Sequence, residues 1–481
     1  MSSTTPARTD PRPTRQSARE LWRLAWPFIL TQSCWTVQIV LDRILLSQSS
    51  IEAVGAGISA VMMFWSGMTL FQYTTLYATT FVAQYTGAGQ PQRVGAVVGQ
   101  AVWFAAIAGL SFLVLVPFAD PITRLAGHNP ELQQLEATYF RCLCFSALPF
   151  LVTAAVSSFF AGLGRSRAVL AMNAGGLAVN AFWAIVLIFG KLGFEPMGIA
   201  GAGWATVAGT STSALIGLLL IGRPANVRDY GIFTQWGLDR TLLGRLLYYG
   251  LAQGVGACLE TLAFSLFLIF IGNLGRIDLA ATSIACTLNL LAYLPMMGVG
   301  QAIEVLVGQY LGANQPTEAE RAAWTGLIFS FSATFLVAVL YVFAPQWLAL
   351  PFQTRDDPEG WAAVVERVPM LLIFVAVYCL FDSLSLVFGF ALRGAGDTRF
   401  VTAVAIVVSW PVMVVPSYLA IAYGWGLYVA WAFGSACVIL LAIIYFLRFL
   451  QGDWKQMRVI EPEARRPMDE STACPLERAP G

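Results

Sequence analysis

The chain alternates long apolar runs with short polar segments. A helix needs about 20 consecutive apolar residues to cross the hydrocarbon core of a bilayer, and twelve runs reach that length. Their approximate limits are 22–46, 55–84, 94–118, 138–161, 168–191, 197–222, 246–272, 280–308, 322–345, 368–392, 400–423 and 426–450. The polar tails, 1–20 and 451–481, are expected to be disordered. The pattern predicts an all-α integral membrane protein with twelve transmembrane helices.

Composition excludes a water-soluble globular protein. Charged residues make up 11% of the chain and apolar residues 57%, whereas a soluble domain carries about 25% charged residues. The net charge of +1 says nothing about partners, and we expect no nucleic-acid partner. The eight cysteines form no CxxC pair, so we interpret them as packing residues.

The distribution of Lys and Arg predicts the orientation. If both tails face the cytoplasm, the cytoplasmic segments hold 21 of the 28 basic residues and the outer loops hold 5. Short cytoplasmic loops carry an excess of Lys and Arg. We therefore expect a multi-pass protein of the plasma (inner) membrane with both termini in the cytoplasm.

Two motifs occur once in each half of the chain. FVAQYTGAGQPQRV (81–94) returns as LVGQYLGANQPTEA (306–319), and AGLGRSRAV (161–169) returns within LRGAGDTRF (392–400). The repeat predicts two six-helix lobes with the same orientation, an N-lobe (21–222) and a C-lobe (246–450), joined by a linker (223–245). Secondary transporters with repeated halves handle substrate near the midplane between them.

Four acidic residues lie inside predicted spans, where a charge costs roughly 2.5–3.5 kcal/mol on insertion scales. These acids are Asp42, Glu260, Glu304 and Asp382. The other half of the repeat has a residue that does not ionise at each equivalent position, so the shared fold does not require an acid there. Each acid is therefore a functional candidate.

Depth in the membrane separates these acids. Glu260 and Asp382 lie near the middle of their spans and in the same lobe, so they can share one site. Asp42 lies towards the outer face, where its neighbour Arg43 offers a structural partner as the alternative to a functional role. Glu304 lies close to the cytoplasmic end, where hydration and a structural role are the preferred interpretation.

Three further side chains are candidate polar ligands. Tyr378 lies one helical turn before Asp382 and therefore on the same face. Asn180 and Asn289 carry amides inside predicted spans. For all three, ordinary packing is the competing interpretation.

Several enzyme classes lack their signatures in this sequence. His128 is the only histidine, and the chain has no Walker A loop for ATP hydrolysis. No nucleophile motif or metal-ligand cluster occurs. We therefore expect no enzymatic activity and no cofactor.

Taken together, these residues resemble the multidrug and toxic compound extrusion (MATE) transporters over about residues 20–450. The local motifs are WPFILTQ, VAQYTGAG, GLGRSR, VGQYLGA and LRGAGDT, and the stronger feature is the joint placement of Asp42, Glu260, Tyr378 and Asp382. The resemblance implies that entry of H⁺ or Na⁺ drives export of bulky organic cations. We expect the protein to act as a monomer in the lipid bilayer. It is closest to the bacterial branch with a C-lobe cation site. Ala184 and Arg43 depart from the pattern of that branch.

The coupling ion and two rival functions remain open. Na⁺ needs several oxygen ligands, and the candidates in the C-lobe are Glu260, Asp382, Tyr378 and Asn289. A proton needs only one carboxylate. The number of C-lobe ligands favours Na⁺. The nearest rival is a lipid-linked oligosaccharide flippase of the same two-lobed superfamily, which should line its cavity with Arg or Lys. A membrane-embedded enzyme is the more distant alternative.

Overall fold

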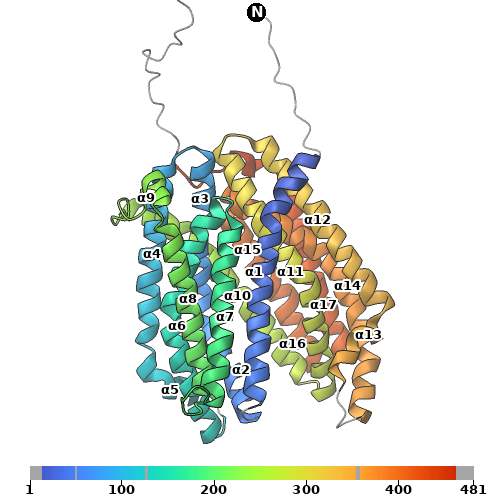
Figure 1. The fold of residues 1–481 in the computed structure, drawn as a ribbon. Coiled ribbons are helices and arrows are strands. Elements are labelled where there is room, and N and C mark those ends of the chain that lie inside the picture. Colours follow the sequence, from blue (N-terminus) through green and yellow to red (C-terminus); the bar gives the residue numbers. More distant parts are fainter. Residues whose placement is uncertain (1–12, 49–50, 125–127, 354–357, 462–481) are drawn as a thin grey trace, which may run out of the picture.

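The computed structural model describes residues 13–48, 51–124, 128–353 and 358–461, and in this part of the chain there are helices and no strand. Eleven helices of the described residues are long and apolar enough to cross a membrane. Helix α2 (Ile51–Leu76), continued by α3 (Ala78–Gly87), fits the remaining predicted span. The helices stand side by side in one bundle (Figure 1). The expected all-α membrane architecture is confirmed.

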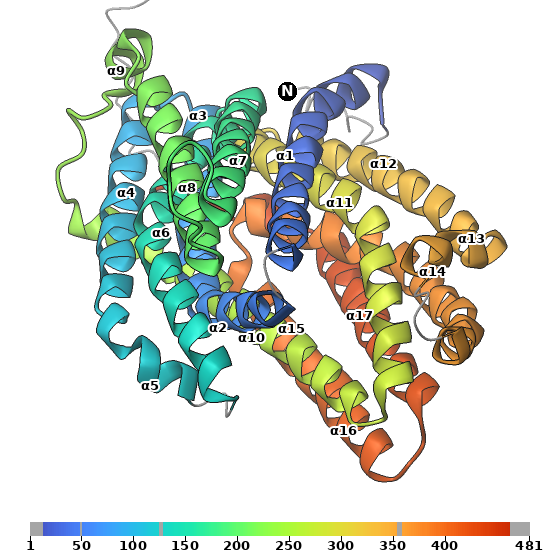
Figure 2. The same cartoon turned by 60° about the horizontal axis from the view of Figure 1, so that its bottom comes forward.

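The helices form two lobes that follow each other along the chain (Figure 2). Besides α2 and α3, the main N-lobe helices are α1 (Arg15–Ser47), α4 (Pro91–Leu113), α6 (Pro130–Gly162), α7 (Ser166–Phe189) and α8 (Ile199–Ile221). The C-lobe consists mainly of α10 (Arg240–Gly272), α11 (Arg276–Gly312), α12 (Pro316–Phe343), α14 (Pro358–Ala395), α15 (Thr398–Ser409), α16 (Val415–Ala422) and α17 (Leu427–Gln451). We call the end of the bundle at which α1 begins the tail face; it is at the top of Figure 1.

Three predicted spans are interrupted or end early. The second span breaks at Tyr77, between α2 and α3. The third leaves the α-helix after Leu113 and continues as the short helices η1 (Val116–Phe118) and α5 (Ala119–Arg124). In the eleventh, a π-helical turn, η3 (Trp410–Val414), separates α15 from α16. Pro411 lies in this turn, and a proline inside a helix removes one backbone hydrogen bond and displaces the preceding turn.

The polar tails are more ordered than their composition suggested. Helix α1 already begins at Arg15, because Thr14 caps it by accepting a 3.2 Å hydrogen bond from Ser17 N. After α17 the chain forms a 3-10 helix, η4 (Asp453–Gln456), and continues to Glu461. The expected disorder is therefore wrong for residues 13–20 and 451–461. The rest of both tails lies outside the described residues.

The segment between the lobes packs against the N-lobe. It contains helix α9 (Pro224–Tyr230), after which Gln100 of α4 donates to Gly237 O over 2.8 Å and accepts from Asp239 N over 3.2 Å. Asp239 then caps α10 through its contacts with Thr241 N and Leu242 N. The segment is thus fixed to α4 up to the start of α10.

At the tail face, residues of the two sequence repeats contact each other across the lobes. Gln84 Nε2 of α3 donates to Gly394 O of α14 over 3.0 Å, and Gln309 Nε2 of α11 donates to Gly162 O of α6 over 2.8 Å. In the repeat, Gln84 corresponds to Gln309 and Gly162 to Gly394. The two bonds are therefore one contact made twice, in opposite directions.

Two glycines allow α3 and α11 to approach each other at this place. A Cβ atom on Gly87 would lie 1.9 Å from Gln309 O, and one on Gly312 would lie 2.1 Å from Gln84 O. These two glycines are also equivalent in the repeat. Any larger side chain at either position would force the backbones apart.

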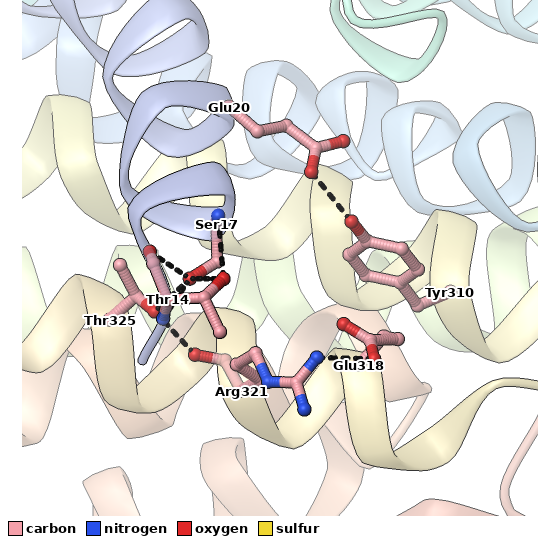
Figure 3. Close-up of polar contacts among 7 residues, drawn as sticks. All are labelled: Thr14, Ser17, Glu20, Tyr310, Glu318, Arg321 and Thr325. Atoms are coloured by element: carbon pink, nitrogen blue, oxygen red, sulfur yellow. Dashed lines mark hydrogen bonds and ion pairs between the residues drawn. The ribbon is translucent and has the colours of Figure 1, made fainter. Parts of the chain in front are cut away.

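The start of α1 adds further contacts between the lobes at the tail face (Figure 3). Tyr310 Oη of α11 donates to Glu20 over 2.7 Å, and the hydroxyls of Ser17 and Thr325 lie 3.1 Å apart. Thr325 belongs to α12. The polar groups of both lobes thus hold the tail face closed.

Candidate functional site

Candidate acids line two cavities. The larger one lies in the C-lobe and has a volume of about 580 Å³. Helices α10, α11, α14 and α17 supply most of its walls, and Tyr73 of α2 is the contribution of the N-lobe. Aromatic side chains form part of the lining, among them Phe264, Tyr293 and Trp431. The space is apolar enough for a hydrophobic molecule and carries a few polar groups that could orient it.

Glu260 and Asp382 both line this cavity. Glu260 comes from α10 and Asp382 from α14, so two helices place the carboxylates around one space. Within the described residues neither carboxylate has a hydrogen bond or an ion pair. An unpaired carboxylate in such a place is costly, and a bound cation or proton would remove that cost.

Two of the predicted ligands accompany these acids. Tyr378 and Asn289 line the same cavity. Cys379 donates its thiol hydrogen to Asn289 Oδ1 over 3.0 Å, which fixes the amide from the side of α14. The four residues that the sequence grouped in the C-lobe thus share one space.

The cavity also contains polar residues that the sequence analysis did not single out. Gln253 lies two turns before Glu260 on α10, and its Oε1 atom is buried without a hydrogen-bond partner. Its spacing of seven residues from Glu260 places it on the same face of the helix, and that signal could have found it. Tyr293 lies one helical turn after the candidate Asn289 on α11, a second signal of the same kind. Tyr73 of α2 had no such signal.

Arg393 is the most informative of these additional residues. The sequence placed it in a turn, because the apolar run ends at about 392, but α14 continues to Ala395. Arg393 therefore lines the cavity, with its guanidinium carbon 5.4 Å from the centroid of the Phe390 ring. Among the described residues, the lining thus combines two acids with one basic residue.

Asp42 lines a separate cavity of about 150 Å³ in the N-lobe. Its neighbours there include Tyr139, Thr206 and Thr210. The Oδ1 atom of Asp42 is buried without a hydrogen-bond partner, and no ion pair of the described residues joins it to the exposed Arg43. The structural pairing of Asp42 with Arg43 finds no support in this geometry.

The last two candidates lie apart from both sets of cavity-lining residues. Glu304 is only 7% exposed and accepts a 2.8 Å hydrogen bond from Thr80 of the opposite lobe, so the expected hydration is wrong. Asn180 is fully buried in α7, and neither its Oδ1 nor its Nδ2 atom has a partner. Glu304 therefore belongs to the interface between the lobes, whereas Asn180 stays an isolated polar group.

Comparisons with known proteins agree with this arrangement. The MatE family model matches residues 27–186 and 254–419, one segment in each lobe. The chain is 30% identical to the multidrug resistance protein PmpM of Pseudomonas aeruginosa over 402 residues, which are 82% of either protein. It is 26% identical to a probable multidrug resistance protein NorM of Mesorhizobium japonicum, over 90% of this chain and 94% of that protein.

Solved structures show the same fold. A MOP superfamily transporter from Pyrococcus furiosus superposes with a TM-score of 0.82 at 19% identity, over 93% of this chain and 97% of that one. The outward-facing conformation of a multidrug resistance MATE family transporter superposes with a TM-score of 0.81, also at 19% identity, over 93% and 98% of the two chains. The family match, the relatives and the two-lobed helical fold lead to one conclusion: this chain belongs to the MatE family of multi-pass membrane transporters.

Proposed function

We propose that this transporter is a secondary antiporter that exports amphipathic organic cations in exchange for Na⁺ or H⁺. The observation that carries this proposal is the C-lobe cavity, where Glu260 and Asp382 face one space without any partner among the described residues. Glu260 and Asp382 are the coupling acids, and the hydroxyl of Tyr378 is an additional ligand. Asp42 serves the N-lobe in a separate step.

Competition for negative charge explains the coupling. The two carboxylates can be neutralised by a bound Na⁺, by protons or by a cationic substrate, and each of these removes the cost of an unpaired charge at mid-membrane depth. Aromatic walls such as Phe264 and Trp431 favour flat, hydrophobic cations. Occupancy by the ion can drive transport only if the ion binds one conformation more tightly than the other.

The choice of ion depends on the oxygen ligands. Glu260, Asp382 and Tyr378 form a candidate Na⁺ set around one cavity, which keeps Na⁺ as the favoured ion. Asn289 is a weaker candidate than its sequence position suggested, because its Oδ1 atom already accepts a hydrogen bond from Cys379. A proton would need only one of the two carboxylates.

The tail face is the cytoplasmic side in this proposal. It carries the predicted cytoplasmic segments, in which 21 of the 28 Lys and Arg residues fall. In this proposal the N-lobe extends over 21–222 and the C-lobe over 246–450. The contacts described above then close the cytoplasmic side of an inner-membrane transporter.

The test is reconstitution of the purified protein in liposomes. A gradient of Na⁺ or pH is imposed across the liposome membrane, and the movement of a fluorescent organic cation across it is followed. Gradient-dependent movement of the dye supports antiport, and identical movement without any gradient would contradict it. A parallel assay with a lipid-linked oligosaccharide tests the flippase alternative. That alternative needs basic side chains for pyrophosphate, whereas Arg393 shares the cavity with two acids.

A further inference from the structure

The segment after the last long helix crosses the tail face from the C-lobe to the N-lobe. We propose that the tail face contains a peptide-binding groove shared by both lobes, whose ligand is the chain's own segment Trp454–Glu461. We call this stretch the C-terminal strap. Bound in the groove, the strap stabilises the closed tail face and must leave the N-lobe before that face opens.

The beginning of the strap is anchored to the C-lobe. Trp454 is fully buried and stacks on Phe449 of α17 with ring centroids 4.7 Å apart. Its Nε1 atom donates to Phe449 O over 2.8 Å. The next residue, Lys455, forms a 2.7 Å contact with Glu320 of α12. These contacts hold the first residues of the strap on one lobe alone.

The end of the strap reaches the N-lobe. Val459 N donates to Gln84 Oε1 of α3 over 2.9 Å, and the Val459 carbonyl accepts from Arg245 of α10. Glu461 lies 3.0 Å from Arg245 and 3.6 Å from Arg93 of α4. The strap is therefore bonded to both lobes, with Gln84 and Arg93 as its partners on the N-lobe.

The burial of two side chains shows that this end of the strap is packed into the protein and does not merely lie on its surface. Val459 is 0% exposed and Ile460 is 6% exposed. The two apolar side chains gain free energy only while the groove surrounds them. Arg458, between the anchor and these residues, donates to Asn314 Oδ1 over 2.6 Å on the C-lobe side.

The strap acts on the same residue that closes the lobes directly. Gln84 uses its amide nitrogen to bind Gly394 O and its amide oxygen to bind Val459 N. If the lobes separate at the tail face, both bonds of Gln84 break, and so does the contact of Arg93 with Glu461. The anchors at Trp454 and Lys455 remain intact, so the strap would stay attached to the C-lobe.

The inference rests on the two-state transport that the proposed function assumes, but its test measures conformation and involves no substrate or ion. Hydrogen–deuterium exchange with mass spectrometry compares the full chain, a truncation after Met457 and a truncation after Glu461. The first truncation removes the part of the strap that reaches the N-lobe. The second keeps it and removes only the residues beyond, so it is the matched control.

We expect truncation after Met457 to accelerate exchange roughly tenfold in residues 81–90 and 306–316, because about one net hydrogen bond and the buried apolar contacts are lost from the closed state. Truncation after Glu461 should leave these segments unchanged. A peptide with the sequence of residues 458–461, the part that this truncation removes, should restore protection of the shorter chain. The same peptide with proline at the position of Val459 should not, since proline lacks the N–H that Gln84 accepts from.

A second variant guards against effects of truncation on folding. Val459→Pro in the full chain removes the same N–H group and should accelerate exchange in the same two segments, with α8 unaffected. Equal exchange at the tail face in the full chain and in both the Met457 truncation and Val459→Pro would overturn the proposal. Acceleration that the wild-type peptide fails to reverse would overturn the groove as a binding site.

Discussion

The tail face and the C-lobe cavity use the internal repeat in opposite ways. At the tail face, equivalent residues of the two halves contact the opposite lobe, as Gln84 and Gln309 do with Gly394 and Gly162. In the cavity, Asp382 has an equivalent in the other half, Phe150, that does not ionise. An interface around a two-fold axis makes each contact twice, so both halves need the same residue. A ligand site inside one lobe needs an acid in that lobe only, so the equivalent position of the other lobe can hold a residue that does not ionise.

The two regions also differ in how their polar groups are satisfied. The side-chain amide of Gln84 is bonded at both its nitrogen and its oxygen, and Glu304 accepts a hydrogen bond from Thr80. The carboxylates of Glu260 and Asp382 have no partner among the described residues. Satisfied groups stabilise one arrangement of the lobes, whereas unsatisfied groups are available to a ligand.

The largest expected effect concerns the cavity. Asp382→Asn keeps the shape of the side chain and removes its charge, so it should lower gradient-driven dye export roughly a hundredfold, because an interaction with a charged group is worth about 1.5–3 kcal/mol. Transport in proteoliposomes measures the loss. Glu131→Gln, the same chemical change at an exposed position of α6, should retain full activity.

A double substitution tests whether the two acids form one site. Glu260→Gln should resemble Asp382→Asn, and the double variant should be little worse than either single one, since residues of one site are not additive. Strictly multiplicative losses would show that the two carboxylates act independently. Full export by Asp382→Asn would remove that residue from the coupling step.

The second prediction concerns the symmetric region. Gly87→Ala and Gly312→Ala each insert a Cβ atom against backbone of the opposite lobe, so each should destabilise the closed tail face by about 1–3 kcal/mol. Hydrogen exchange in residues 81–90 and 306–316 should rise by similar factors in both variants. Gly67→Ala is the control, because its Cβ would meet Phe112 at an ordinary 3.7 Å. A strong effect at one glycine alone would argue against the symmetry of this interface.

Much of the fold and the identity of the acids could be predicted from the sequence. Apolar run lengths gave the spans because the thickness of a bilayer sets them, and the repeat gave the lobes. The end of α14 was missed because Arg393 and two glycines resemble a turn, although neighbouring helices support the last helical turn. The order of residues 453–461 was missed because burial of Val459 and Ile460 depends on a groove that exists only in the folded protein.

Contacts between distant segments were beyond the sequence for the same reason. Glu304 was expected to meet water near a membrane surface, yet Thr80 of the other lobe covers it. The joint presence of Glu260, Asp382, Tyr378 and Asn289 around one cavity could be predicted, since mid-membrane acids are few. The presence of Tyr73 in this cavity could not be predicted, because Tyr73 reaches the cavity from the N-lobe.

The third prediction separates the two cavities. Asp42→Asn should reduce export several-fold and leave ion binding at the C-lobe acids unchanged, because Asp42 lines the other cavity. Isothermal titration of the detergent-solubilised protein with Na⁺ measures that binding, and a pH-jump release assay does so for protons. Arg43→Ala should export normally, since no ion pair joins Arg43 to Asp42 in the described residues. If Arg43→Ala reproduced the defect, the two residues would form a structural pair.

The smallest expected effect decides the coupling ion within the cavity. Tyr378→Phe removes one oxygen from the lining and leaves both carboxylates in place. If Na⁺ is the ion, the loss of one ligand should raise the Na⁺ concentration for half-maximal export by a factor of about two, the worth of roughly 0.4 kcal/mol. If H⁺ is the ion, the variant should shift the pH profile only modestly and show no dependence on Na⁺. Replacing Na⁺ by choline at a constant pH gradient is the control on the unmodified protein: unchanged export would exclude Na⁺ and leave Asp382 as a proton carrier.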